Sequence, residues 1–206
     1  MLTPFPRHRL QGFRLPGLSF LVLAALIFCT VPSWAQDSGP VVSMQTNHGE
    51  IVIQLQPDKA PSTVANFLEY VNSGFYEGTV FHRIAEGFVI QGGGYTEDLK
   101  LKPFGEPIKN EADNGLTNAR GTLSMARKPD PHSATVQFFI NLGDNGEYLD
   151  QGKTGDGWGY AVFAYVVEGM DVVDEIAAVK TGKRIEIPNM PVPVEPVIIQ
   201  KVSVRE

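Results

Sequence analysis

The chain has 206 residues, of which 43% are hydrophobic, and its formal net charge is −6. This length is enough for one domain to build a hydrophobic core without disulfide bonds, and the sequence holds a single cysteine. The acidic balance argues against nucleic-acid binding, which depends on clustered lysine and arginine side chains that neutralise phosphates.

Residues 1–35 have the pattern of a secretory signal peptide. Three arginines and no acid precede a mostly apolar run over residues 18–31. This run is shorter than the about 20 residues that a membrane-spanning helix needs. Ser33 and Ala35 place small side chains at the two positions that a signal peptidase reads. We therefore predict cleavage after Ala35, no stable membrane insertion of the mature chain, and one domain over residues 36–206.

Cys29 permits a second interpretation, in which the cysteine accepts a lipid as in a lipoprotein. Phe28 stands directly before it, where such a site needs a small side chain, so we prefer the cleaved signal. The signal removes three arginines and no acid, so the mature chain would carry a formal net charge of −9 and no cysteine. A domain without thiols suits an oxidising compartment.

The first elements of the domain are a predicted hairpin and a predicted helix. Residues 41–56 form two apolar runs separated by residues 47–49, and side chains alternate in the second run as in a half-buried strand. A helix begins at Pro61 and ends near Gly74. Its apolar residues recur at the spacing of one helix face, which we expect to lie in the core. They are Val64, Phe67, Leu68 and Val71.

Residues 80–96 combine polar groups with large apolar side chains. Arg83 brings a guanidinium that keeps its charge at every relevant pH, and Gln91 brings an amide, so both need partners when they are half buried. Residues 92–94 are glycines, which let the backbone turn or approach another group closely; without a phosphate-binding motif around them, we interpret them as a turn. On spacing alone, a β-hairpin with one ion-paired arginine explains this segment equally well.

The second half of the chain repeats this arrangement. Within residues 121–142 a strand of small residues and a polar loop lead to Gln137, which stands beside two phenylalanines. Residues 170–178 predict a second helix and residues 197–204 a last strand, whereas the prolines of residues 180–196 indicate an extended surface loop. Many short strands with only two helices favour a closed or nearly closed β-barrel over a parallel sheet.

These segments resemble the cyclophilins, a family of peptidyl-prolyl cis-trans isomerases. FHRIAEGFVIQGGGYT, SMAR with QFFI, and YLD followed by GYAVFAYVVEGMDVVDEI are similar to the family's motifs in order and spacing, from about Val41 to the C-terminus. The resemblance implies a mainly β fold: a closed eight-stranded antiparallel β-barrel capped by two α-helices. Together with the signal it indicates the bacterial periplasmic branch, and hence a location in the periplasm.

The resemblance also implies a mechanism. Rotation about a prolyl peptide bond faces a barrier of about 18–20 kcal/mol, because the nitrogen lone pair is delocalised into the carbonyl. A donor that binds this nitrogen stabilises the twisted state more than either planar isomer. Arg83 is the expected donor, Gln91 orients it, and Phe88 helps to hold the proline ring. No metal, cofactor or proton relay is required.

Further residues are implied to bind substrate. Gln137 is expected beside Gln91. Ala126 is expected to line a neighbouring pocket for the residue before proline, and the backbone of Arg127 to pair with the substrate main chain. Tyr148 stands where human-type relatives have a tryptophan, so we expect weak cyclosporin binding. The implied walls of the proline pocket are Phe88, Val89, Phe139, Leu149 and Tyr160.

Other polar residues have simpler interpretations. His48, His82 and His132 are far apart in sequence, so we predict no metal site. His82 is expected to be a buried imidazole with a hydrogen bond to the backbone. Glu111 is expected in a solvated loop, and Ser124 lacks the flanking residues of a catalytic nucleophile.

The sequence therefore predicts a monomeric peptidyl-prolyl isomerase that acts on proline-containing polypeptides during the folding of exported proteins. The alternative is a non-catalytic module that binds proline-containing segments in the same groove. Arg83 and the pocket aromatics are retained, which favours the enzyme. A hydrolase would need a nucleophile that the sequence does not indicate.

Overall fold

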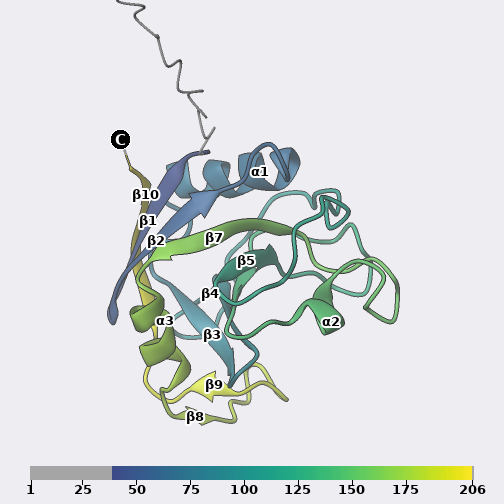
Figure 1. Cartoon of the computed structure of the whole chain (residues 1–206). Coiled ribbons are helices and arrows are strands. Elements are labelled where there is room, and N and C mark those ends of the chain that lie inside the picture. The colour runs from purple at the N-terminus through teal and green to yellow at the C-terminus, as the bar shows by residue number, and fades with distance from the viewer. Residues whose placement is uncertain (1–38, 206) are drawn as a thin grey trace, which may run out of the picture. The chain divides into compact units, whose positions relative to one another are not determined.

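Eight strands of the computed structural model, which describes residues 39–205, close into one antiparallel barrel (Figure 1). The strands follow the order β1-β10-β3-β4-β6-β5-β7-β2, and β2 pairs again with β1, so the sheet has no free edge. The predicted mainly β fold and closed eight-stranded barrel are confirmed. The strands are β1 (Val41–Thr46), β2 (Gly49–Leu55), β3 (Thr79–Ala85), β4 (Val89–Thr96), β5 (Thr122–Met125), β6 (Phe138–Asn141), β7 (Val162–Glu168) and β10 (Ile198–Val204).

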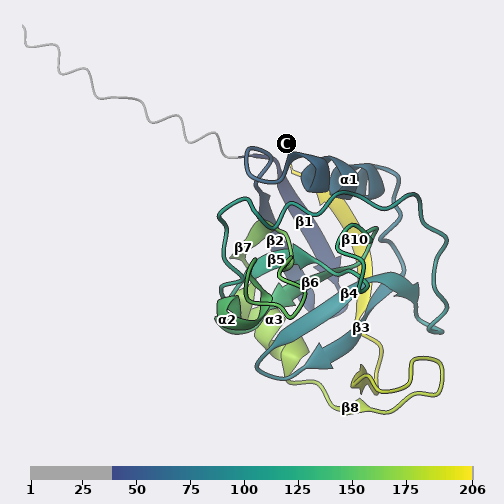
Figure 2. The ribbon, with the colours of Figure 1, turned by 90° about the vertical axis from the view of Figure 1, so that its right-hand side faces the viewer.

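Two helices cap the barrel at opposite ends, where the sequence predicted them (Figures 1 and 2). They are α1 (Pro61–Asn72) and α3 (Met170–Ala177). A third helix, α2 (Gly146–Leu149), is a single turn that the sequence did not predict, because four residues are too few to show a helical period. It lies in the connection between β6 and β7, on the side of the barrel that carries long loops.

The apolar face of α1 closes the core at one end of the barrel. Phe67 is fully buried, and its ring meets the ring of Phe138 edge to face with centroids 5.8 Å apart. Aromatic rings prefer this geometry because the positive edge of one ring meets the negative face of the other. Leu68 is only partly buried, so the buried stripe is narrower than the sequence pattern predicted.

Glu111 lies in a partly exposed loop, as expected, and in addition its carboxylate caps the N-terminus of α1. Its carboxylate accepts hydrogen bonds from the backbone N–H groups of Ser62 at 3.1 Å and Thr63 at 2.8 Å, and from the Thr63 hydroxyl at 2.7 Å. The first N–H groups of a helix have no partner within the helix, and a negative charge at this end is favourable. This cap comes from 48 residues away in sequence, beyond the reach of local pattern analysis.

The three consecutive glycines lie inside β4, so the expectation of a turn was wrong. A Cβ atom at Gly93 would come within 2.7 Å of the Phe138 ring and 2.9 Å of the Tyr76 ring, and Gly93 has a φ of +82°. The pairing of β3 with β4 shifts register opposite this stretch. The glycines therefore permit an irregular strand to pass close to two buried rings, which is the close approach that glycine allows.

Residues 180–196 form more than the predicted surface loop. β8 (Thr181–Gly182) pairs with β9 (Val192–Pro193), and Ile187 and Val192 are buried against Val80 and Leu99. The backbone N–H of Ile84 in β3 donates to the carbonyl of Pro191 at 2.9 Å. The segment thus packs on the outer face of β3, at the bottom of the barrel in Figure 1.

The predicted signal, its cleavage site and Cys29 lie outside the described residues. Within residues 39–205, none of the helices is long and apolar enough to cross a membrane.

Candidate active site

Three polar side chains form a row across the strands that carry the predicted site. Arg83 in β3 faces Gln91 in β4 as a direct register pair. The Nη1 atom of Arg83 donates to Oε1 of Gln91 at 3.3 Å, and Nε2 of Gln91 donates to Oε1 of Gln137 at 3.0 Å. Gln137 immediately precedes β6, the strand that pairs with the other side of β4. The amide of Gln91 is therefore fixed from both sides and in turn orients the guanidinium.

Arg83 is half buried, yet it forms no ion pair with any of the residues in the described part of the chain. This excludes the ion-paired hairpin that the sequence pattern also allowed. Burial lowers the pKa of the guanidinium, and the neighbouring Tyr160 acts against this shift. Because arginine has so high a pKa, the group remains charged at neutral pH. The site thus presents a fixed cation with free donor capacity.

His82 lies next to Arg83 in sequence and is almost completely buried. Burial, with a contribution from the charge of Arg83, lowers its pKa to about 4, and the nearby Val80 backbone acts in the opposite direction. Neither ring nitrogen meets the geometry of a hydrogen bond to the described residues, so the predicted bond to the backbone is not formed. His82 is therefore neutral at pH 7, and its ring packs against Tyr95 with centroids 4.6 Å apart.

The buried state of His82 predicts a loss of stability in mild acid. The unfolded chain binds the proton near pH 6.5 and the folded protein only near pH 4. The unfolded state therefore binds more protons between these values, and the free energy of unfolding falls as the pH drops. The shift corresponds to roughly 3 kcal/mol. Urea unfolding at pH 7 and pH 4 measures this loss.

A matched variant separates His82 from the carboxylates that titrate in the same range. His82→Phe keeps a ring against Tyr95 and removes the titrating group, so it should lose distinctly less stability than the unaltered protein between pH 7 and pH 4. An equal loss in both proteins would contradict the assignment.

An apolar cluster separate from the main core forms the walls beside Arg83. Val89, Phe139 and Leu149 are buried, and other apolar residues pack against them, Tyr160 included. The rings of Phe139 and Tyr160 meet at 73° with centroids 5.6 Å apart. Together with Arg83 these walls enclose a hollow of about 310 Å³, which we call the main hollow. It is lined by Arg83, Phe88, Val89, Gln91, Ala126, Arg127, Phe139, Leu149, Tyr160 and Met190.

The structure brings together most of the residues that the sequence assigned to the site. Gln137 lies just outside the main hollow and lines an adjacent hollow of about 160 Å³, which Gln91, Ala126 and Arg127 share. Tyr148 is not among the lining residues and is 68% exposed. Successive helix residues point about 100° apart, so α2 turns Leu149 into the wall and Tyr148 towards solvent.

Met190 is a lining residue that the sequence did not indicate. It belongs to residues 180–196, and the neighbouring carbonyl of Pro191 fixes this segment to β3 beside Arg83. A methionine among prolines shows no periodicity, so only the folded chain reveals its position.

Among residues 39–205, those that line the main hollow include no serine, threonine or cysteine that could act as the nucleophile of a hydrolase. Ser124 lies in the neighbouring strand β5, but its hydroxyl is fully buried and donates to Oδ1 of Asn118 at 2.7 Å. A fixed guanidinium above an apolar hollow suits a reaction in which charge develops at one substrate atom without covalent catalysis.

Known proteins are similar to this chain in sequence. Residues 41–204 match the family described as cyclophilin type peptidyl-prolyl cis-trans isomerase/CLD. Peptidyl-prolyl cis-trans isomerase B of Escherichia coli K12 is 56% identical over 166 residues, which cover 81% of this chain and 100% of that protein. A peptidyl-prolyl cis-trans isomerase of Streptomyces antibioticus is 53% identical, with 79% and 97% covered.

Solved structures are similar as well. A crystal structure of a cyclophilin type peptidyl-prolyl cis-trans isomerase from Cryptosporidium parvum has a TM-score of 0.66 and 24% identity, with 81% of this chain and 98% of that chain covered. A second structure of that protein, determined in the presence of the dipeptide Ala-Pro, has a TM-score of 0.65. At this level of identity the likeness concerns the fold.

Proposed function

The chain belongs to the cyclophilin-type peptidyl-prolyl cis-trans isomerases, and from this premise we propose that it accelerates the isomerisation of X-Pro bonds in exported proteins through a hydrogen bond from Arg83 to the prolyl nitrogen. One observation carries the mechanism. Arg83 is a half-buried cation without an ion-pair partner among the described residues, oriented by Gln91 at the edge of an apolar hollow.

The chemistry follows from the electronic structure of the peptide bond. In a planar isomer the prolyl nitrogen shares its lone pair with the carbonyl and accepts hydrogen bonds poorly. Twisting the bond localises the lone pair and makes the nitrogen an acceptor. A guanidinium N–H placed at this nitrogen therefore binds the twisted state more strongly than either isomer, which is the condition for catalysis. Arg83 remains positioned and charged throughout, so it needs no reorganisation.

The apolar walls have a separate task. A proline ring in the main hollow would contact Phe139, Leu149 and Tyr160, which hold it while the acyl side of the bond rotates. These contacts form equally in the planar and twisted states, so they set affinity more than turnover. We assign the adjacent hollow, which Ala126 and Gln137 line, to the residue before proline.

An assay on a short Ala-Pro peptide tests this function. The protein should accelerate the cis-to-trans step, and it should also accelerate the refolding of an exported protein whose slow phase is proline isomerisation, a step that takes tens of seconds or longer without a catalyst. Peptide binding without acceleration would indicate the non-catalytic module instead.

The periplasmic location is part of the proposal and rests on the sequence of residues 1–35. Mass spectrometry of the protein from a periplasmic extract should find a mature N-terminus at Gln36. An Ala35→Phe variant, which places a large side chain at the cleavage position, should accumulate the uncleaved chain. A mature species that begins with a lipidated Cys29 would contradict the predicted cleavage.

A further inference from the structure

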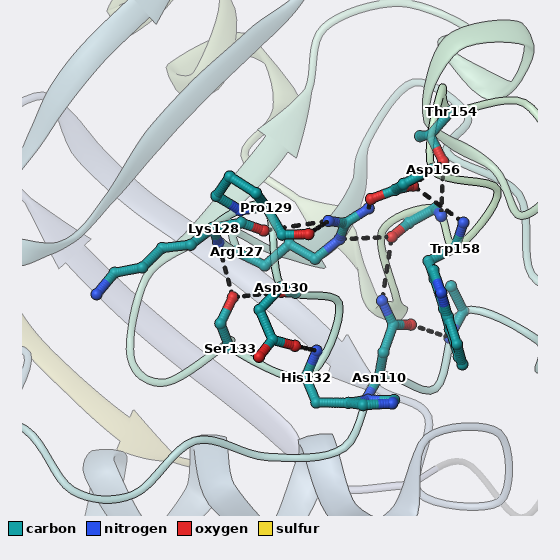
Figure 3. A network of polar contacts seen from close by, with 12 residues as sticks. Asn110, Arg127, Lys128, Pro129, Asp130, His132, Ser133, Thr154, Asp156 and Trp158 are labelled. Atoms are coloured by element: carbon teal, nitrogen blue, oxygen red, sulfur yellow. Dashed lines mark hydrogen bonds and ion pairs between the residues drawn. The ribbon is translucent and has the colours of Figure 1, made fainter.

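The side chain of Arg127 is buried and links two loops that flank the main hollow (Figure 3). Only 4% of this side chain is exposed, although arginine is ordinarily a surface residue. Its Nε donates to the carbonyl of Gly159 at 2.9 Å, its Nη1 to the carbonyl of Lys128 at 3.1 Å, and its Nη2 forms an ion pair with Asp156 at 2.7 Å. The guanidinium thus joins the loop of residues 127–133 to that of residues 150–160.

The same guanidinium lies against the ring of Tyr160. The Cζ atom of Arg127 is 4.7 Å from the ring centroid, within the range of a cation–π contact, and Tyr160 also contacts Phe139 in the wall of the hollow. The backbone N–H of Tyr160 donates to the carbonyl of Leu149 at 2.8 Å. Arg127 therefore packs against the Tyr160 ring, and the other contacts of Tyr160 are with Phe139 and Leu149, which also line the main hollow.

The carboxylate of Asp156 is also held by hydrogen bonds within its own loop, in addition to its ion pair with Arg127. Its Oδ1 accepts hydrogen bonds from the Thr154 hydroxyl at 2.7 Å and from the backbone N–H of Trp158 at 3.0 Å. Hydrogen bonding lowers the pKa of this carboxyl to about 2. The bond from Thr154 contributes most, the bond from Trp158 comes next, and Arg127 adds to both. The carboxylate is therefore charged at neutral pH, and the loop around it is fixed by its own hydrogen bonds.

The loop of residues 127–133 is likewise held by contacts of its own and by contacts with its neighbours. The Ser133 hydroxyl accepts a hydrogen bond from the backbone N–H of Lys128 at 2.9 Å, and the ring of His132 packs against Trp158 with centroids 4.9 Å apart. The side chain of Asn110 donates to the carbonyl of Gly159 at 3.1 Å, so this carbonyl accepts hydrogen bonds from both Asn110 and Arg127. In Figure 3 the side chains of Asn110 and Arg127 reach the same carbonyl oxygen, and Asp156 lies on the other side of the guanidinium.

We propose that Arg127 is a positioning residue for the isomerase reaction and that, anchored by Asp156, it holds the Tyr160 ring as a wall of the main hollow. This role belongs to the side chain and is separate from the main-chain pairing expected of residue 127. It rests on the proposed function, because Tyr160 matters only if the proline ring enters the hollow.

The proposal predicts a specific kinetic pattern. A wall contact forms in the planar and twisted states alike, so its loss raises KM and leaves kcat nearly unchanged. Arg127→Gln and Asp156→Asn should each raise KM for an Ala-Pro peptide about 3- to 10-fold, with kcat within about twofold of the unaltered protein. NMR exchange measurements give both constants, and titration with the peptide gives the affinity independently.

Two controls separate positioning from general loss of structure. Arg120 and Asp174 form an arginine–aspartate pair of similar length, 2.8 Å, that is exposed and lies outside the site, so Asp174→Asn should leave KM unchanged. If Arg127 acts through Tyr160, the effect of Arg127→Gln should fall below about twofold in a Tyr160→Ala background, because residues that act as a unit are not additive.

Several outcomes would overturn the proposal. The first is an unchanged KM in Asp156→Asn and Arg127→Gln proteins whose circular dichroism is native. The second is a rise of KM in Asp174→Asn as large as that in the two variants. The third is an effect of Arg127→Gln on KM that is just as large in the Tyr160→Ala background. Should Arg127→Gln fail to fold, Asp156→Asn decides alone. If the unaltered protein bound the peptide without isomerising it, the proposed function would fail, while peptide affinity would still decide the role of Arg127.

Discussion

Replacing Arg83 by alanine should reduce kcat for an Ala-Pro peptide by about 100- to 1000-fold, the loss expected when a single preorganised donor to a transition state is removed. The contact that Arg83 would make with the prolyl nitrogen exists only in the twisted state, so KM should change much less. The side chain is half buried and has no ion-pair partner among the described residues. Stability should therefore change by about 1 kcal/mol or less.

Arg83→Lys is the matched control for this experiment. It keeps the charge but loses the planar arrangement of donors that lets one N–H meet Gln91 while another points into the hollow. We expect kcat to fall in this variant too. Activity that survives Arg83→Ala in a natively folded protein would exclude the proposed mechanism. If the unaltered protein binds the peptide but does not accelerate its isomerisation, the protein is the non-catalytic binding module.

Replacing Gly93 by alanine should destabilise the protein by roughly 2–5 kcal/mol. The new Cβ would approach the rings of Phe138 and Tyr76 within 3 Å, and both rings are fully buried. Overpacking of this kind costs about 1–3 kcal/mol. The left-handed backbone at φ +82° adds about 1–2 kcal/mol for a residue with a side chain. Urea unfolding at neutral pH measures the sum.

Gly78 offers a matched control, because its φ is +74° and a Cβ there would meet no atom within 4 Å. Gly78→Ala should therefore lose only the backbone part, about 1–2 kcal/mol. The difference between the two variants isolates the steric contribution at Gly93. If both variants lost the same free energy, the close approach of β4 to the buried rings would not explain the glycine.

The hairpin of β3 and β4 could be predicted because its information is local. Large apolar residues, a short turn and a polar pair eight positions apart are all visible within residues 80–96, and the register places Arg83 opposite Gln91. The apolar stripe of α1 was visible for the same reason, since one helix face repeats every three to four residues.

Other features depend on contacts between distant parts of the chain. Glu111 caps a helix that begins 50 positions earlier at Pro61. The three glycines looked like a turn because their sequence does not show the two rings behind Gly93. Met190 stands in a proline-rich segment without periodicity and reaches the hollow only because that segment packs on β3.

From the sequence by itself, the many short strands predicted a closed or nearly closed β-barrel. The resemblance to the cyclophilins implied the eight-stranded form, the pairing of Gln91 with Arg83 and the apolar residues of the site. The tertiary structure alone decided how these residues are supported. Arg127 has the sequence of an ordinary surface arginine, and only barrel closure brings Asp156 and Tyr160 to its side chain. Local sequence patterns show which side chains share one face of a strand or helix. The partners of a buried charge come from segments far apart in sequence, so they come together only in the complete fold.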